Sequence, residues 1–399
     1  MSPQLETAAA ELCASGGFRR ALEIAGRHAD AVDRDARFPI EAIEALRSAE
    51  AFGWYVPRHY GGAGAHIGDL CEATLELSRR CAATGMIFAM HQIQVGCIVR
   101  HMGHSTWFDG YLRRLVREQR LIASATSEAG VGGDVRKSIA AIQPVEDAPG
   151  SLLQFEKKAT TISYGGHADD LLTTVRCSPA AGPGDQVLVL THISETRLEQ
   201  TGEWDTLGMR GTCSPGFVVR ASCHADQVLP VPFAAIAAET MVPFSHLLWA
   251  HVWLGLSLDA FQRAQNFVRE QARQNPGGTP PSALRLSELS ALMAQFRCAV
   301  RAALDEYRDR ADSDGRAGLS TMGYAIRINN LKILASETAP DVCARALRIG
   351  GVMGYKNGGP FSVGRHLRDA YSAALMIAND RLHASNAAML LVHREGKAR

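Results

Sequence analysis

The stretch RALRIGGVMGYKNGGPFSVGRHLRDAYSAALMIAND at residues 345–380 decides how the rest of the chain is interpreted. Its pattern predicts a helix that ends at a glycine-rich break, a second helix through Arg368 and Asp369, and a polar turn that closes at its last two residues. Glycine removes the side chain where a backbone must turn or approach a flat or charged group. A second glycine-rich stretch, ASATSEAGVGGDV, lies far upstream at residues 123–135. Taken alone, each is an ordinary helix end or loop, but together they lead us to expect one site between them.

Length and composition restrict the class of protein. The 399 residues exceed the size of about 250–300 at which a single core stops growing, so two or three subdomains are expected. Hydrophobic residues make up 46% and charged residues 21%, which is typical of a compact soluble protein. The net charge of +1 provides no field for nucleic acid or anionic lipid, so neither is expected as a partner.

The cysteines and the apolar segments predict a cytoplasmic location. Nine cysteines are an odd number, and none forms a C-x-x-C pair or a metal-finger spacing, so we expect reduced thiols and no metal site. The first residues lack the basic-then-apolar pattern of a signal peptide. An apolar run at 244–261 is interrupted by Ser245, His246 and His251, which favours a buried helix over a membrane span.

Hydrophobic periodicity predicts a mainly α, α+β fold in three parts. Helical spacing runs through residues 4–120. Five strand-like runs follow with no helix between them, which favours an antiparallel sheet over a Rossmann fold. Helices are then expected at 244–274, 282–311, 322–349 and 362–391, lengths that suit a four-helix bundle. The expected domains are an N-terminal helical domain at 1–120, a central antiparallel β domain at 121–232 and a C-terminal four-helix bundle at 233–399.

This order of parts resembles the acyl-CoA dehydrogenase superfamily over nearly the whole chain. Four local segments carry the resemblance, and their order and spacing make chance agreement improbable. They are FGWYVPRHYGGAG at 52–64, SATSEAGVGGDV at 124–135, LGMRGTCS at 207–214, and RIGGVMGY with RHLRDA at 348–370. The resemblance implies a flavoenzyme that holds FAD.

Positions that match the family's flavin contacts carry hydroxyl groups. The resemblance places Thr126 and Ser127 against the flavin and Ser163 beside it, while Thr161 stands where the family usually has a tryptophan over the ring. Polar donors at these positions suit the pyrimidine edge and the negative charge of reduced flavin. The alternative is that they are ordinary threonines and serines of a sheet surface.

A second group of positions matches the part of the family site that holds the FAD pyrophosphate. Arg348, Gly350 and Gly351 match the turn that approaches it from a neighbouring subunit, where free N–H groups suit an anion. Arg273 stands for the arginine of an R-x-x-F-G motif, but the segment RQNPG has lost the phenylalanine. A shared site implies a homo-oligomer, in the family usually a tetramer built as a dimer of dimers.

The catalytic base is the main departure from the family. The dehydrogenases remove a proton with a glutamate whose position falls near Ile377, and no glutamate stands there. Asn379 and Asp380 are the neighbouring polar residues; we assign Asn379 to the cofactor site and Asp380 to the role of a shorter carboxylate base. The alternative for Asp380 is a helix N-cap.

Two histidines and two pocket residues complete the predicted site. His246 matches the helix on which some members carry the base, and His91 lies on the apolar helix that lines the family's substrate pocket. For both, a buried histidine bonded to a backbone carbonyl is the alternative. Met90 is expected to contact the substrate, as is Gly133, which replaces a serine near the acyl thioester and so weakens the case for an ordinary CoA substrate.

Three functions follow from these residues. The first is α,β-dehydrogenation of an acyl thioester on CoA or a carrier protein, with an electron-transfer flavoprotein as acceptor. The second is a flavin-dependent monooxygenase supplied by a flavin reductase, which the missing glutamate and His91 favour. The third is a catalytically inactive flavin-binding assembly protein. The dehydrogenase is preferred at this point because TSEAGVGGD and LGMRG stay close to the dehydrogenase forms.

Overall fold

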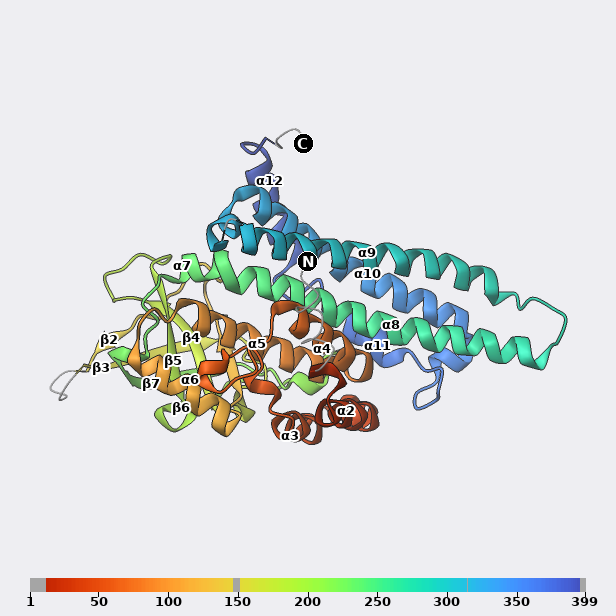
Figure 1. Cartoon of the computed structure of the whole chain (residues 1–399), viewed down its shortest axis with the longest axis horizontal. Coiled ribbons are helices and arrows are strands. Elements are labelled where there is room, and N and C mark those ends of the chain that lie inside the picture. The colour runs from red at the N-terminus through yellow and green to blue at the C-terminus, as the bar shows by residue number, and fades with distance from the viewer. Residues whose placement is uncertain (1–11, 146–150, 314, 395–399) are drawn as a thin grey trace.

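The computed structural model describes residues 12–145, 151–313 and 315–394 (Figure 1). The expected helical start at residues 4–11 lies outside this range. The first part consists of helices α2 (Gly16–Arg34), α3 (Ile40–Ser48), α4 (Ile67–Arg80), α5 (Ala82–His101) and α6 (Thr106–Glu118). Helices α2 and α6 begin where the hydroxyls of Ser15 and Ser105 accept the N–H groups of Phe18 and Phe108.

Helix α5 is apolar on all sides because it runs through the core. Two helical segments in the described part, Ala82–His101 and Phe233–Gln274, have the length and composition of a membrane span. In the first, 89% of the apolar window is buried inside the molecule, and in the second 61%. This burial is what the core helices of a globular protein show.

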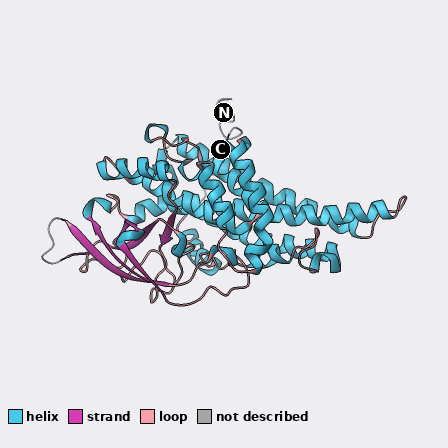
Figure 2. Cartoon of the chain, turned by 90° about the horizontal axis from the view of Figure 1, so that it is seen from below, coloured by secondary structure: helices cyan, strands magenta, loops and turns pink. Residues whose placement is uncertain are grey.

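The central part contains two small sheets. One has the order β1–β4–β5, with β1 (Ile122–Ala125), β4 (Asp170–Arg176) and β5 (Gln186–His192). The other has the order β2–β3–β7–β6 and is antiparallel throughout, with β2 (Gln143–Pro144), β3 (Leu152–Ala159), β6 (Thr196–Gln200) and β7 (Phe217–His224). Figure 2 shows the strands gathered at one end of the molecule, with the long helices projecting away from them.

One strand pairing differs from the expected antiparallel pattern. Strands β1 and β4 are parallel, with Ile122 opposite Asp170, because the intervening chain passes through β3 of the other sheet before it returns. Strand β6 was not expected at all. Its sequence, TRLEQ, is polar and half-buried or exposed at a sheet edge, so hydrophobic alternation does not reveal it.

Long helices return after the sheets. A short helix α7 (Phe233–Ile236) leads through a π-helical turn into α8 (Val242–Gln274), which packs with α9 (Ser282–Ser313) and α10 (Met322–Tyr355). The expected helix break is present, because Gly351 leaves the helical conformation with φ 53° and ψ −137°. The expected fourth long helix at 362–391 is wrong: it is divided into α11 (Gly364–Tyr371) and α12 (Asn379–Leu390).

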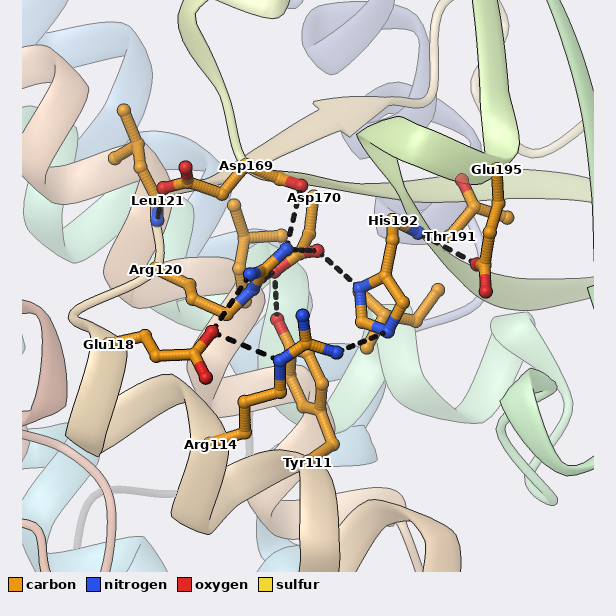
Figure 3. Close-up of polar contacts among 12 residues, drawn as sticks. Tyr111, Arg114, Glu118, Arg120, Leu121, Asp169, Asp170, Thr191, His192 and Glu195 are labelled. Atoms are coloured by element: carbon orange, nitrogen blue, oxygen red, sulfur yellow. Dashed lines mark hydrogen bonds and ion pairs between the residues drawn. The ribbon is translucent and has the colours of Figure 1, made fainter.

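A buried polar cluster joins α6 to the first sheet (Figure 3). The carboxylate of Asp170, 0% exposed, accepts bonds from the Arg120 guanidinium at 2.6 and 2.7 Å and from the Tyr111 hydroxyl at 2.8 Å. His192 Nδ1 lies 2.6 Å from the same carboxylate. Burial alone would raise the pKa of Asp170, but the bonds from Arg120, His192 and Tyr111 outweigh it and lower the pKa.

Helix α11 is docked onto the loop that connects strands β6 and β7 of the second sheet. The Asp369 carboxylate accepts the N–H of Met209 at 2.6 Å, and Arg368 forms an ion pair with Asp33 of α2. A Cβ added to Gly208 would lie 2.2 Å from the Arg368 carbonyl oxygen, so only glycine allows this approach. The L-G-M-R-G and R-D-A segments, far apart in the sequence, therefore form one joint.

Candidate active site

Hydroxyl groups gather where strands β1 and β3 end. The Ser127 hydroxyl donates to the Thr161 carbonyl at 2.8 Å and accepts the Thr161 N–H at 3.1 Å. Thr126 is half-buried, and its hydroxyl has no side-chain hydrogen bond in the described part of the chain. The predicted residues Ser127 and Thr161 are thus in contact, and Thr126 offers an unused polar group beside them.

Ser163 belongs to a second chain of hydroxyls close to the first. Its oxygen accepts a bond from Ser214 at 2.9 Å, and the Ser214 and Thr212 hydroxyls lie 2.8 Å apart. Ser214 and Thr212 are part of the LGMRGTCS segment but were not singled out individually. Their hydroxyls gave no signal in the sequence because Ser214 is 51 positions from Ser163, with strands β4, β5 and β6 between them.

The turn between α11 and α12 contains Ile377, near which the resemblance places the family glutamate. Ile377 adopts φ 47°, in the left-handed region that a β-branched side chain rarely occupies. Its carbonyl oxygen accepts the Lys332 ammonium at 2.9 Å. Such a conformation costs on the order of 1–3 kcal/mol and persists only where neighbouring contacts hold it, and Lys332 provides such a contact.

Lys332 was not identified from the sequence. It comes from α10, is 0% exposed, and donates to Asn379 Oδ1 at 2.8 Å while its ammonium lies 5.8 Å from the centre of the Trp253 ring. The Asn379 amide nitrogen also donates to Ser336 Oγ at 3.0 Å. Burial lowers the pKa of Lys332 to about 8. A lysine within the apolar pattern NNLKILAS was the available signal.

Asp380 is exposed in the first turn of α12, and its carboxylate has no hydrogen bond or ion pair within the described residues. The helix N-cap is Ala378, so the N-cap alternative for Asp380 is wrong. The next residue, Arg381, was not predicted, and its guanidinium lies beside Gly133 of the upstream glycine-rich loop. Gly133 therefore does lie near the start of α12.

Both histidines are buried and bonded to backbone. His91 is 0% exposed, with Nε2 at 2.9 Å from the Phe52 carbonyl and Nδ1 accepting the Ile122 N–H at 3.1 Å, so both ring nitrogens are occupied. Burial lowers its pKa to about 4. His246 Nδ1 lies 3.1 Å from the Ile328 carbonyl, and burial lowers its pKa to about 3. His91 therefore has both ring nitrogens occupied, whereas Nε2 of His246 is buried without a partner in the described part of the chain. The role of either histidine as a base stays a prediction.

The sequence of the chain also matches models of known families. Residues 19–119 match the acyl-CoA dehydrogenase N-terminal domain and residues 237–378 match the acyl-CoA dehydrogenase C-terminal domain, together more than half of the chain. The chain belongs to the acyl-CoA dehydrogenase family. The solved structures agree with this assignment at the level of the fold.

Relatives of this family member include two kinds of enzyme. A dibenzothiophene monooxygenase of Mycolicibacterium goodii is 24% identical and aligns over 79% of this chain and 78% of its own length. A short-chain-specific acyl-CoA dehydrogenase of Clostridium acetobutylicum is also 24% identical and aligns over 85% of this chain and 86% of its own length. The FMN-bound structure of TdsC from Paenibacillus sp. A11-2 has a TM-score of 0.80 at 20% identity and covers 95% of this chain and 98% of its own.

Four predicted cofactor residues of this acyl-CoA dehydrogenase family member lie at the other end of the molecule. Gly351 is about 28 Å beyond Lys332 along α10, at 1.5 Å per residue, and Arg348 and Gly350 lie beside it. Arg273 is exposed near the end of α8, and its Nη1 lies 3.5 Å from Oε2 of Glu270. Within one chain these residues lie far from the turn at Ile377, and their expected approach to the FAD of a neighbouring subunit stays a prediction.

Met90 is the remaining predicted residue. It is half-buried on α5, between the fully buried Ala89 and His91, and packs against the main hydrophobic core. Its contact with a substrate stays a prediction.

Proposed function

We propose that this acyl-CoA dehydrogenase family member is a flavin-dependent oxygenase that works with a separate flavin reductase. One observation supports the proposal: the turn near which the family glutamate is expected carries Ile377, whose carbonyl is held by Lys332. A dehydrogenase needs a base close to the α-carbon of its substrate. His91 is unsuited to that task because it is buried and both of its ring nitrogens are bonded to backbone groups.

The hydroxyl groups at the ends of β1 and β3 suit a bound flavin. The Thr126 hydroxyl has no partner in the described part of the chain, Ser127 is bonded to Thr161, and Ser163 is bonded to Ser214. We assign these residues to the polar edge of the ring, which they would orient by hydrogen bonds. A bound reduced flavin would supply the electrons for oxygen activation. The family form is FAD, and TdsC shows that the same fold accommodates FMN.

The proposed substrate is an electron-rich molecule such as an aromatic or amine compound. Relatives named as dibenzothiophene monooxygenases support this class. Thr161 is smaller than the tryptophan that the dehydrogenases carry at the matching position. The space left beside the flavin ring would give room for an aromatic substrate. Lys332 and Asn379 would hold the turn that borders this space.

The test compares two reactions of the purified protein with its flavin. Under anaerobic conditions, a panel of acyl-CoA thioesters should leave the flavin absorbance unchanged. After chemical reduction and admission of oxygen, dibenzothiophene should be converted to an oxygenated product detected by mass spectrometry. Bleaching by any acyl-CoA, without oxygen-dependent product, would refute the oxygenase function.

Dehydrogenation of an acyl thioester is the second candidate. It is favoured by the carboxylate of Asp380, which is free of partners in the described structure and lies three residues after Ile377. Retention of flavin with neither reaction would support the inactive binding protein instead.

A further inference from the structure

Tyr164 directly follows the predicted flavin residue Ser163, and its backbone is strained. Its φ of 45° lies in the left-handed region, where a bulky side chain is a genuine outlier. The side chain is 0% exposed. Strain of this kind persists only where the surrounding contacts hold it, and it concentrates at functional sites. The contacts of Tyr164 therefore indicate what the strain serves.

Hydrogen bonds from both the backbone and the side chain hold Tyr164 in place. Its N–H donates to the carbonyl oxygens of Thr212 and Cys213, at 2.7 and 3.1 Å. Its hydroxyl donates to the Ile122 carbonyl of β1 at 2.9 Å. Burial raises the pKa of Tyr164, which keeps the hydroxyl protonated and therefore a donor. One residue thus ties strand β1 to the loop that contains residues 207–214.

The loop on the other side of these bonds is strained in the same way. Met209 and Cys213 have φ values of 52° and 43°, and the Thr212 N–H donates to the Met209 carbonyl at 3.1 Å. Seven non-glycine residues of the described chain have a positive φ. Four of them, Tyr164, Met209, Cys213 and Ile377, lie on segments that border the proposed site. Contacts between these segments are what keep such conformations in place.

Each segment that Tyr164 joins carries hydroxyl groups of the proposed flavin site. Strand β1 leads directly into Thr126 and Ser127. The loop brings the Ser214 hydroxyl to within 2.9 Å of the Ser163 oxygen. The placement of these hydroxyls relative to one another therefore depends on the residue to which both segments are bonded.

The Ile122 peptide is fixed from two directions. Its N–H donates to His91 Nδ1 at 3.1 Å, and its carbonyl accepts the Tyr164 hydroxyl. Ile122 is 0% exposed, so water does not readily replace a donor that is withdrawn there. A buried carbonyl that loses a donor pays the cost of its lost solvation or shifts towards another group. Loss of the Tyr164 hydroxyl should consequently displace the end of β1.

We propose that Tyr164 is a positioning residue of the flavin site, which fixes the end of β1 and the loop at 207–214 relative to Ser163. The side chain is buried and acts through these neighbours. The proposal rests on the proposed function only in that these hydroxyls hold the flavin, and it holds for either candidate reaction. Hydrogen bonds to the ring tune its electronic properties, so Tyr164 should influence both the affinity and the spectrum of the flavin.

Tyr164→Phe removes the hydroxyl and keeps the ring. Flavin-free full-length protein is titrated with FMN and with FAD, and binding is followed by flavin fluorescence. The variant should bind about tenfold more weakly than the wild type, the loss expected when one hydrogen bond of the site is misplaced. The visible absorption and circular dichroism bands of the bound flavin should also shift. A purely structural role would lower the midpoint of thermal unfolding and leave these bands unchanged.

Tyr111→Phe is the matched control. Tyr111 is also a buried tyrosine, and its hydroxyl donates to Asp170 at 2.8 Å in the cluster between α6 and the first sheet. This variant should also lower the midpoint of thermal unfolding, but leave flavin affinity and the visible bands as in the wild type. Wild-type affinity and bands in Tyr164→Phe, or equal changes in the two variants, would refute the positioning role.

Cys213→Gly tests the same contacts from the side of the loop. Glycine adopts a φ of 43° without strain, so the variant should fold, but the loop that Tyr164 holds gains freedom. Flavin affinity should fall several-fold, and wild-type affinity in this variant would also count against the proposal. Binding needs no turnover. Tyr164-dependent binding without an oxygen-dependent product would therefore refute the oxygenase function alone, and unchanged binding in an active oxygenase would refute the positioning role alone.

Discussion

The carboxylate of Asp369 accepts the backbone N–H of Met209 at 2.6 Å, although the two residues are 160 positions apart. Asp369 belongs to α11, and Met209 to the loop that precedes β7. Both are buried, at 4% exposed each. The bond places the R-D-A helix directly on the L-G-M-R-G loop, and the same loop carries Thr212 and Ser214 to the hydroxyls near Ser163.

Replacing Asp369 with asparagine should change how stability depends on pH. Burial raises the pKa of Asp369 from 3.8 to about 6, so the folded state binds a proton between pH 4 and 6 that the unfolded state has released. The contribution of this group to the free energy of unfolding therefore falls as the pH rises through that window, by an amount on the order of 2 kcal/mol. The Asp369→Asn variant should not show this fall. Urea denaturation at pH 4.5 and 7 measures it. The exposed Asp226→Asn is the control, and parallel curves for Asp369→Asn and wild type would contradict the prediction.

Asp170→Asn should destabilise the junction between α6 and the first sheet. The variant leaves the half-buried Arg120 with Glu118 as its remaining counter-charge, so the loss should be at most about 3–5 kcal/mol, the value for a broken buried ion pair. Because the pKa of Asp170 is lowered, its contribution is present above pH 4 and should disappear as the pH falls further. Glu156→Gln, in the exposed pair with Arg220, should cost less than about 1 kcal/mol in the same denaturation experiment. Equal effects of the two variants would show that the cluster is not stabilising.

Lys332→Met should loosen the turn at Ile377. Two hydrogen bonds are lost, which should lower the free energy of unfolding by about 2–3 kcal/mol. Burial lowers the pKa of Lys332 from 10.5 to about 8, so the contribution of this group to the free energy of unfolding rises between pH 8 and 10. The difference in free energy of unfolding between the wild type and the variant should therefore grow in that range. Near-ultraviolet circular dichroism should also change, since the ammonium lies over Trp253. The exposed Lys356→Met serves as control; unchanged spectra and stability in Lys332→Met would remove Lys332 from this role.

Asp380→Asn separates the two candidate reactions. The side chain is exposed and does not cap α12, so the midpoint of thermal unfolding and the flavin content should stay within error of the wild type. Oxygen-dependent product formation should also persist. If an acyl-CoA bleaches the flavin of the wild type but not that of the Asp380→Asn variant, Asp380 is the base of a dehydrogenase.

Arg348→Glu tests whether the distant glycine turn serves a second copy of the chain. Arg348 is exposed beside Gly350 and Gly351, too far from Ser127 to share a flavin within one chain. If two copies share the site, the variant should retain several-fold less FAD but the same amount of FMN, which lacks the second phosphate. Chromatography of released flavin and sedimentation velocity measure both effects. Equal retention of FAD by Arg348→Glu and by the Arg285→Glu control would argue against a shared site.

Local patterns were enough to predict the order of the parts. Helical spacing, strand-like runs and the break at Gly351 depend on near neighbours in the sequence, and the structure confirms all three. Ser127 and Thr161 were each matched to the flavin site, but their hydrogen bonds to each other are a finding of the structure. The polar edge strand β6 and the division of the last helix at Ile377 could not be predicted from local patterns, because they depend on where distant segments lie.

The sequence by itself determined the fold family of this protein, since periodicity and a few glycine-bearing motifs are local properties of the chain. Tertiary structure alone decided which polar side chains are free to act. Both ring nitrogens of His91 are occupied by backbone groups, whereas Nε2 of His246 has no partner in the described part of the chain. Lys332 is buried beneath the Ile377 turn, and Arg381 lies beside Gly133, 248 positions away in the sequence. Burial and hydrogen-bond partners set the charge and availability of each group, and both arise only when remote segments pack together.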